Sequence, residues 1–314
     1  MRRLLGGACA LAATIGLLAG CAPNSGRYID LGYFASADLV TTENVVYGEA
    51  PALPDETMPP GGVETLLLDV VMPRLDADAE TARPAILWIH GGGFRAGSKA
   101  SARRWLNEWA SRGYVAIGIN YRLDQDNYCQ AIQDGQPFPP GEDVQCYNAI
   151  VAAQHDAQAA VRWVRANAAD LDVDPADIVA TGSSAGAVTS VNLAYNSHDP
   201  GTSNDLPGPS SVVAAAALSG AAYPEIADVG PGDAPVSYAH CTNDQAVDWT
   251  ITSAGIDAAR AEGLVADVLV WEPPESCSSG RIHGVDLMTD HRAEIDLAFT
   301  QFFYRHTGLS QTEN

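Results

Sequence analysis

A serine flanked by glycines is the first feature of this sequence that points to chemistry. Ser184 lies in the pattern Gly182-x-Ser184-x-Gly186, directly after the apolar run Ile178–Thr181 and before a stretch that favours a helix. A serine on a sharp strand-to-helix turn projects its Oγ from the end of a sheet, and glycines two residues away avoid collisions in that turn. The pattern alone is equally typical of a Gly/Ser turn that caps a helix, so its surroundings decide between the two interpretations.

A glycine-rich turn upstream would supply the second half of the same chemistry. The segment HGGGF (residues 90–94) follows the continuous apolar run Ala85–His90. Acyl transfer needs backbone N–H donors aimed at a developing oxyanion, and bare glycines expose such donors without obstruction. The N–H of Ala185, directly after the serine, would be a further donor. Three glycines also make an ordinary flexible turn, but their occurrence after one strand, with GxSxG after a later one, favours an acyl-transfer site.

The elements that must position these motifs alternate between strands and helices. Continuous apolar runs are typical of strands buried on both faces, so the pattern predicts one α/β domain with a mostly parallel central sheet flanked by helices on both faces. The expected strands are Val63–Met72, Ala85–His90, Tyr114–Asn120, Ile178–Thr181, Val212–Leu218, Val236–His240 and Val265–Trp271. The expected helices are 100–112, 148–169, a helix from the serine turn to about 196, 250–262 and 289–306.

Residues 66–304 resemble a known family of enzymes. The segments LLLDVVMP, WIHGGGFRAGSK, NYRL, HDAQAAVRWVRANAADLDVDPADIVATGSSAGA and AHCTNDQAV occur in the order found in α/β-hydrolase carboxylesterases of the HGGG type, related to hormone-sensitive lipase-like and feruloyl-esterase-like enzymes. The resemblance implies an α/β-hydrolase fold and oxyanion donors at Gly92, Gly93 and Ala185. One departure is Ala187, where many relatives have a second glycine after the serine turn.

The serine needs a base and an acid that orients it, which follow it along the chain in this fold. Asp244 lies in Cys241-Thr242-Asn243-Asp244, after the strand Val236–His240, and matches the acid loop of the family. Its rivals are Asp248, on the same segment, and Asp233, which comes before the strand.

His283 is the predicted base, because it lies after the strand Val265–Trp271 and before the final helix. His291, near the start of that helix, is the rival, and His240 is the third choice. His90 is expected to shape the glycine loop. The remaining histidines are expected on the surface or on helix faces: His155, His198 and His306.

These residues predict hydrolysis of carboxylic esters by a serine hydrolase with a Ser184–His283–Asp244 triad and an acyl-enzyme intermediate. This chemistry needs neither a metal nor an organic cofactor, and the expected partner is a small-molecule or polymer-linked ester. A thioesterase or a small amide or peptide hydrolase would share the same machinery. A catalytically inactive hydrolase fold that serves as a surface binding module is the alternative from another class.

The N-terminus predicts export. Arg2 and Arg3 precede the short apolar run Leu4–Leu18, and Leu-Ala-Gly-Cys21 resembles a bacterial lipoprotein signal. Removal of residues 1–20 would leave Cys21 lipidated, giving a membrane anchor in the cell envelope, expected at the outer membrane or cell surface. An ordinary signal peptide cut elsewhere is the alternative.

The predicted domain organisation follows from these features. A signal peptide (1–20) precedes a tether and irregular segment (21–43), the hydrolase domain (44–308) and a C-terminal tail (309–314). The formal net charge of −22 would repel polyanions, so nucleic acid is excluded as an expected partner.

Four cysteines remain after the signal and Cys21, and an exported chain would pair them. Three pairings are possible, of which 129–146 and 241–277 are predicted: Cys129 and Cys146 would close a short loop, while Cys241 and Cys277 would pin the loops of Asp244 and His283. No CxxC or HxxxH spacing favours a metal site instead. Residues 124–147 form either a lid beside the pocket or a stapled surface excursion.

Overall fold

One eight-stranded sheet organises the computed structural model, which describes residues 25–53, 61–78, 80–124, 145–223, 226–273, 277 and 282–311. The strand order is β1-β2-β4-β3-β5-β6-β7-β8, with β2 antiparallel to both of its neighbours and every other pair parallel. The strands are β1 Leu39–Pro51, β2 Val63–Pro73, β3 Arg83–Ile89, β4 Val115–Ile119, β5 Val173–Ser183, β6 Ala214–Leu218, β7 Val236–Cys241 and β8 Ala266–Trp271.

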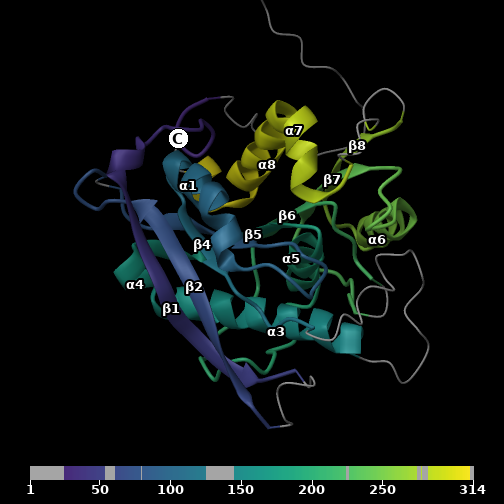
Figure 1. Ribbon diagram of the computed structural model, residues 1–314. Helices are drawn as coiled ribbons and strands as arrows, with labels where there is room; N and C mark the ends of the chain where they lie inside the picture. The colour runs from purple at the N-terminus through teal and green to yellow at the C-terminus, as the bar shows by residue number, and fades with distance from the viewer. Residues whose placement is uncertain are drawn as a thin grey trace, which may run out of the picture.

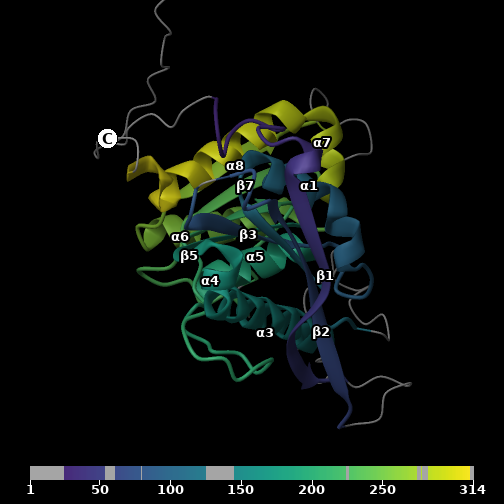
Figure 2. The ribbon, with the colours of Figure 1, turned by 90° about the vertical axis from the view of Figure 1, so that its left-hand side faces the viewer.

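Helices cover both faces of this sheet because its central strands are apolar on both sides. In β3, Leu87 and Ile89 enter one core cluster while Ile86 and Trp88 enter the other, as the alternation of side chains along a strand requires. The first cluster is covered by α3, α5 and α6, and the second by α1 and α8 (Figure 1, Figure 2). The predicted α/β architecture, with a mostly parallel sheet between two helical layers, is therefore confirmed.

The helices agree with the predicted ones, apart from two interruptions. The α-helices are α1 Arg103–Arg112, α3 Gln145–Ala166, α4 Ala168–Leu171, α5 Ala185–Tyr195, α6 Trp249–Ala261, α7 Leu287–Asp290 and α8 Arg292–His306. The short 3-10 helices are η1 Ser36–Asp38, η2 Lys99–Ala102, η3 Gly284–Asp286 and η4 Gly308–Gln311. The expected helix 148–169 is broken at Asn167, and the expected helix 289–306 is broken at His291.

The N-terminal strand β1 is a correction to the sequence analysis, which expected irregular chain up to residue 43. Leu39–Pro51 pairs antiparallel with β2 at the edge of the sheet, with register shifts around Thr42/Val45 and Val46/Gly48. Most of its residues are exposed, and Val46 is 53% exposed. An edge strand that is interrupted by bulges and buries only Tyr47 and Ala50 lacks the strict alternation that predicts a strand from sequence.

The described part of the expected tether also packs on the domain. Tyr28, Ile29 and Phe34 are buried. The N–H groups of Tyr28 and Phe34 donate to the carbonyls of Arg112 (2.7 Å) and Ser111 (2.8 Å) at the end of α1. At the other terminus, Leu309 lies in η4 and is buried, although it was expected in the tail. Both segments bury apolar side chains that their short, aperiodic sequences do not reveal.

Candidate active site

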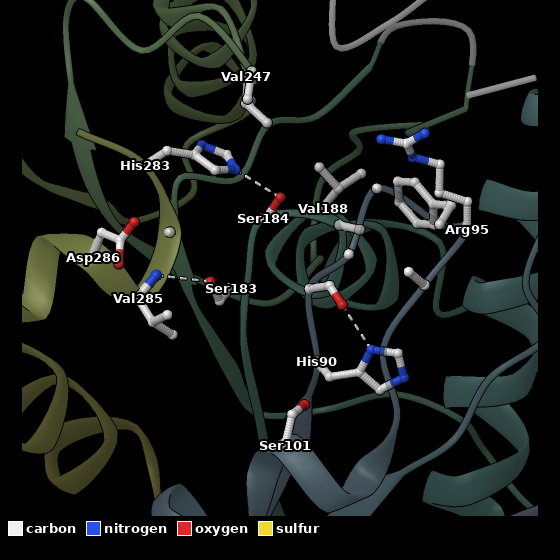
Figure 3. Close-up of a pocket in the computed structure, with 18 of the residues that line it drawn as sticks. His90, Arg95, Ser101, Ser183, Ser184, Val188, Val247, His283, Val285 and Asp286 are labelled. Atoms are coloured by element: carbon white, nitrogen blue, oxygen red, sulfur yellow. Dashed lines mark hydrogen bonds between the residues drawn. The ribbon is translucent and has the colours of Figure 1, made fainter. Parts of the chain in front are cut away.

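Ser184 occupies the sharp turn between β5 and α5. Its φ of 57° is rare for a residue with a side chain, and its N–H donates to the carbonyl of Leu218 at the end of β6 (2.9 Å). A Cβ at Gly182 would collide with the carbonyl of Gly186, and one at Gly186 would collide with the carbonyl of Ile89. The turn therefore requires both glycines of the sequence motif, and it presents the Ser184 side chain to a cavity (Figure 3).

The structure brings together the three side chains predicted to form the triad. Nε2 of His283 lies 2.7 Å from Oγ of Ser184, and Nδ1 of His283 lies 2.7 Å from Oδ2 of Asp244 (the first contact is drawn in Figure 3). An ionised carboxylate accepts only, so Nδ1–H donates to Asp244 and Nε2 is left to accept from the serine hydroxyl. Ser184 follows β5, Asp244 follows β7 and His283 follows β8, so all three lie at the carboxyl edge of the parallel strands.

The carboxylate of Asp244 is fully buried and held by three N–H donors. Besides His283, its Oδ1 accepts from the backbone N–H groups of Ala246 (2.9 Å) and Val247 (3.1 Å). Burial alone would raise the pKa of Asp244, but the hydrogen bond and charge of His283, together with the backbone donors, bring that pKa below its ordinary value. Asp244 is therefore ionised at neutral pH, as an orienting acid must be.

The rival acids serve other purposes. Asp248 caps α6, where its carboxylate accepts from the N–H of Thr250 (2.7 Å). Asp233 accepts from the N–H of Gly230 (2.8 Å) in the turn ahead of β7. Neither makes a hydrogen bond to His283 among those the described residues form.

The rival histidines also have their own partners. His291 stacks on the ring of Trp271, with centroids 4.1 Å apart. His240 is fully buried, with Nε2 2.9 Å from the carbonyl of Val247 and 3.7 Å from Oδ2 of Asp244. Burial lowers the pKa of His240, although the nearby carboxylate of Asp244 acts in the opposite direction. His240 thus lies beside the acid loop as a neutral imidazole.

The glycine loop packs directly on the serine turn. A Cβ at Gly91 would lie 3.2 Å from Cβ of Ser184, so the two segments are in close contact. Gly92 and Gly93 both have positive φ, 127° and 63°. These glycines and Ala185 line the same cavity as Ser184. The three residues predicted as oxyanion donors thus lie at the cavity of the serine, and their role as donors stays a prediction.

His90 shapes this loop from within. Its ring stacks on Tyr121 with centroids 4.3 Å apart, and the Tyr121 hydroxyl donates to the His90 carbonyl (2.9 Å). Nδ1 of His90 lies 2.8 Å from the carbonyl of Gly91. Burial lowers the pKa of His90, which favours a neutral ring. His90 therefore supports the glycine loop, and His283 is the histidine that contacts Ser184.

The cavity around Ser184 has a volume of about 750 Å³. Arg95 and Val188 lie on one side of Ser184, and Val285 and Asp286 lie on the other (Figure 3). The cavity is therefore bordered by side chains on both sides of Ser184.

A disulfide links the acid loop to the segment ahead of the base. Cys241 ends β7, three residues before Asp244, and is bonded to Cys277. The side chain of Asn243 also donates to the Cys277 carbonyl (3.3 Å). The predicted 241–277 pairing is confirmed.

The other cysteine predictions concern residues that are only partly described by the structure. Cys146 is buried near the start of α3. Its predicted partner Cys129, and most of the expected lid 124–147, lie outside the described residues, as does Cys21. The 129–146 pairing and the lid stay predictions.

Two serine hydroxyls near the triad were not singled out from the sequence. Ser219, directly after β6, accepts from the N–H of Gly284 (2.9 Å), and Ser183 accepts from the N–H of Val285 (3.0 Å). The signal that points to Ser219 is a serine directly after a buried strand, a position that it shares with Ser184.

The described residues contain no group of three or more His, Cys, Asp or Glu side chains arranged to hold a metal ion. Within the same part of the chain, no helix is both long and apolar enough to cross a bilayer.

Comparisons with known proteins show similarity to esterases. The family model described as the carboxylesterase family matches residues 53–206, just under half of the chain. Gut esterase 1 of Caenorhabditis briggsae is 30% identical over 142 residues, which is 44% of this chain and 23% of that protein. Chlorogenic acid esterase of Aspergillus niger is 31% identical over 136 residues, 42% of this chain and 24% of that protein. The chain thus matches about a quarter of the length of these curated relatives.

Solved structures show the same fold over most of the chain. Esterase 2 of Thermogutta terrifontis, phosphoramylated by tabun, superposes with a TM-score of 0.62 and 22% identity, covering 86% of this chain and 95% of that one. Its butyrate-bound form gives a TM-score of 0.58 and 22% identity, covering 78% and 91%. The predicted α/β-hydrolase fold is confirmed.

Proposed function

We propose that this protein hydrolyses carboxylic esters with Ser184 as nucleophile, His283 as general base and Asp244 as the acid that orients the base. The observation that carries the proposal is the unbroken chain of two 2.7 Å hydrogen bonds from Ser184 Oγ through His283 to Asp244. An activated serine requires this arrangement, in which the nucleophile contacts the base and a third group fixes the base.

The reaction begins when Oγ of Ser184 attacks the ester carbonyl and passes its proton to Nε2 of His283. Asp244 stabilises the imidazolium that forms, and its position on Nδ1 keeps Nε2 free to accept. The carbonyl oxygen gains negative charge, which the N–H groups of Gly92, Gly93 and Ala185 stabilise. His283 then gives its proton to the leaving alcohol, and an acyl group remains on Ser184.

Water completes the cycle by the same relay. His283 removes a proton from a water molecule as it attacks the acyl carbonyl, and returns the proton to Ser184 as the acid product leaves. The cavity, with space on both sides of Ser184, supports an ester whose acyl and alcohol parts both extend beyond a few atoms. The names of the curated relatives, gut esterase and chlorogenic acid esterase, support the ester class.

The proposed location is the cell envelope, with a lipid on Cys21. The basis is the Leu-Ala-Gly-Cys21 sequence after a basic start and an apolar run. Incorporation of labelled palmitate into the parent chain and its loss in Cys21→Ala would support the anchor. Equal labelling of both chains would exclude Cys21 as the anchored residue.

The decisive test of the activity is hydrolysis of p-nitrophenyl acetate, butyrate and octanoate by the full chain in mild detergent. Ser184→Ala is expected to abolish turnover. Ser253→Ala, at a partly exposed position on α6 that does not line the cavity, is expected to retain it. A phosphonate inhibitor should label the parent chain once, at Ser184. Turnover that persists in Ser184→Ala would overturn the proposal, as would a folded parent chain that hydrolyses no ester.

A further inference from the structure

Ser219 has the same unusual backbone conformation as the nucleophile. Its φ is 54°, against 57° for Ser184, and both residues directly follow parallel strands that pair with each other. The N–H of Ser184 donates to the carbonyl of Leu218 at the end of β6, and the N–H of Ser219 donates to the carbonyl of Ala239 in β7, each at 2.9 Å. Each of two adjacent strands is thus followed by a serine with positive φ. The two serines lie side by side, because the last residues of the strands, Ser183 and Leu218, pair with each other.

This conformation is unfavourable for a residue that carries a Cβ, and glycine would adopt it without cost. A positive φ at a residue other than glycine persists only where the surrounding structure imposes it, and such residues cluster at functional sites. Ser184 has an evident reason for its conformation, because it is the proposed nucleophile. Ser219 needs a reason of its own.

The hydroxyl of Ser219 supplies that reason. It is fully buried and accepts a hydrogen bond from the N–H of Gly284, the residue directly after His283. The neighbouring Ser183 hydroxyl accepts from the N–H of Val285, one residue further along (drawn in Figure 3). The backbone that follows the base is thus fastened to the ends of both β5 and β6.

Close packing makes this attachment specific. Gly284 has a φ of 58°, and a Cβ at this position would lie 2.6 Å from Oγ of Ser183. The chain can approach the two hydroxyls only because residue 284 is glycine. Asp244 holds the imidazole of His283 from one side, while the two serines hold its backbone.

We propose that Ser219, together with Ser183, is a positioning residue that sets Nε2 of His283 at hydrogen-bond distance from Ser184. The inference rests on the proposed function for its effect on turnover. Ser219 is not among the residues that line the cavity in the described structure, so its effect should appear in kcat rather than in KM.

The test separates positioning from folding by replacing Ser219 with glycine. Ser219→Gly removes the acceptor of the Gly284 N–H, which costs stability, and relieves the positive φ, which offsets that cost, so it should melt at a higher temperature than Ser219→Ala. Its kcat on p-nitrophenyl butyrate should nevertheless fall about tenfold to a hundredfold, because small displacements of a catalytic group carry costs of this order. Ser219→Ala should lose a similar factor in kcat and also melt at a lower temperature.

A matched control and a conservative variant complete the series. Ala82→Gly relieves a positive φ of 58° ahead of β3, away from the site, and should leave kcat unchanged. Ser183→Thr retains a hydroxyl acceptor and should keep most of the activity that Ser183→Ala loses. A Ser219→Gly chain with the parent kcat would overturn the proposal.

Proton NMR tests the positioning role independently of turnover. A parent chain that hydrolyses no ester would contradict the proposed function alone, and the NMR measurement would still test the position of His283. The Nδ1–H proton of His283, hydrogen-bonded to Asp244, should give a protected downfield signal in proton NMR. The signal should be present in the parent chain and in Ala82→Gly, and lost by exchange in Ser219→Gly. Its retention in Ser219→Gly would overturn the proposal.

Discussion

Cys241 and Cys277 join the loop of the orienting acid to the segment that leads to the base. Cys241 ends β7 shortly before Asp244, and Cys277 precedes His283 by six residues. Asp244 and His283 therefore meet through a side-chain hydrogen bond and also through a covalent link between their loops.

Removal of this disulfide should affect both stability and turnover. The bond closes a sequence separation of 36 residues, which the chain-entropy model converts to about 4 kcal/mol of unfolding free energy. The double variant Cys241→Ala/Cys277→Ala should therefore unfold at a lower denaturant concentration. Its kcat should fall about three- to tenfold under conditions where it remains folded, because the base loses part of its positioning.

The kinetic measurement must be made well below the unfolding transition of the variant. A variant that loses stability but keeps the parent kcat would show that the disulfide acts on folding alone and that the hydrogen bonds around His283 suffice for positioning.

Replacement of the orienting acid should have a much larger effect. In Asp244→Asn, the amide can donate to Nδ1 of His283 and so favour the tautomer with a proton on Nε2, which cannot accept from Ser184. We expect kcat on p-nitrophenyl butyrate to fall about 10³- to 10⁴-fold. Asp248→Asn removes the same charge four residues away and retains a side chain that caps α6, so it should keep the parent activity. Equal losses in both variants would argue that Asp244 acts only through its charge.

Much of this site was predictable because its signals are local. The Ser184 turn and the glycine loop are fixed by contacts over a few residues, in which a Cβ would collide with backbone, and such contacts leave glycines in the sequence. The order of strands then places Asp244 and His283 at the carboxyl edge beside Ser184, since parallel strands end on the same side of a sheet. The 241–277 disulfide follows from the same geometry.

The rest was not predictable because its causes lie in distant packing. The edge strand β1 is exposed and bulged, so it has no clear periodicity. Ser219 gains its importance from a hydrogen bond to Gly284, 65 residues along the chain. The serine after the expected strand Val212–Leu218 is visible in the sequence, but its positive φ and its hydrogen bond to Gly284 are not.

The buried histidine beside the acid loop should make stability depend on pH. Burial holds the pKa of His240 below its ordinary value. The charges of Asp244 and Asp248 raise this pKa, and the charge of His283 lowers it further. The unfolded chain therefore binds a proton that the folded chain does not. This contribution to stability is fully present above about pH 6.5 and is lost as pH falls from about 6.5 towards the folded pKa.

Denaturant titrations between pH 8 and pH 5 measure this effect. His240→Gln keeps a nitrogen that can donate to the Val247 carbonyl, so it should fold while its stability falls less steeply with acid. A full proton difference corresponds to about 1.4 kcal/mol per pH unit. His198→Gln, at a surface position, is the comparison variant. An unchanged slope in His240→Gln would assign the acid sensitivity to other groups.

The two sides of the cavity should select different halves of the substrate. Val188 and Val285 lie on opposite sides of Ser184 (Figure 3), so Val188→Phe and Val285→Phe should each narrow one side. Two ester series measure the outcome: p-nitrophenyl esters with acyl chains of increasing length, and acetate esters of alcohols of increasing length. One variant should lose about tenfold in kcat/KM on long acyl chains, and the other a similar factor on long alcohols.

Both variants should hydrolyse the shortest ester at a rate near that of the parent chain, because a small ester reaches neither side chain. If both variants lose activity on the same series, the acyl and alcohol parts share one side of the cavity, and the opposite side is not used by these substrates.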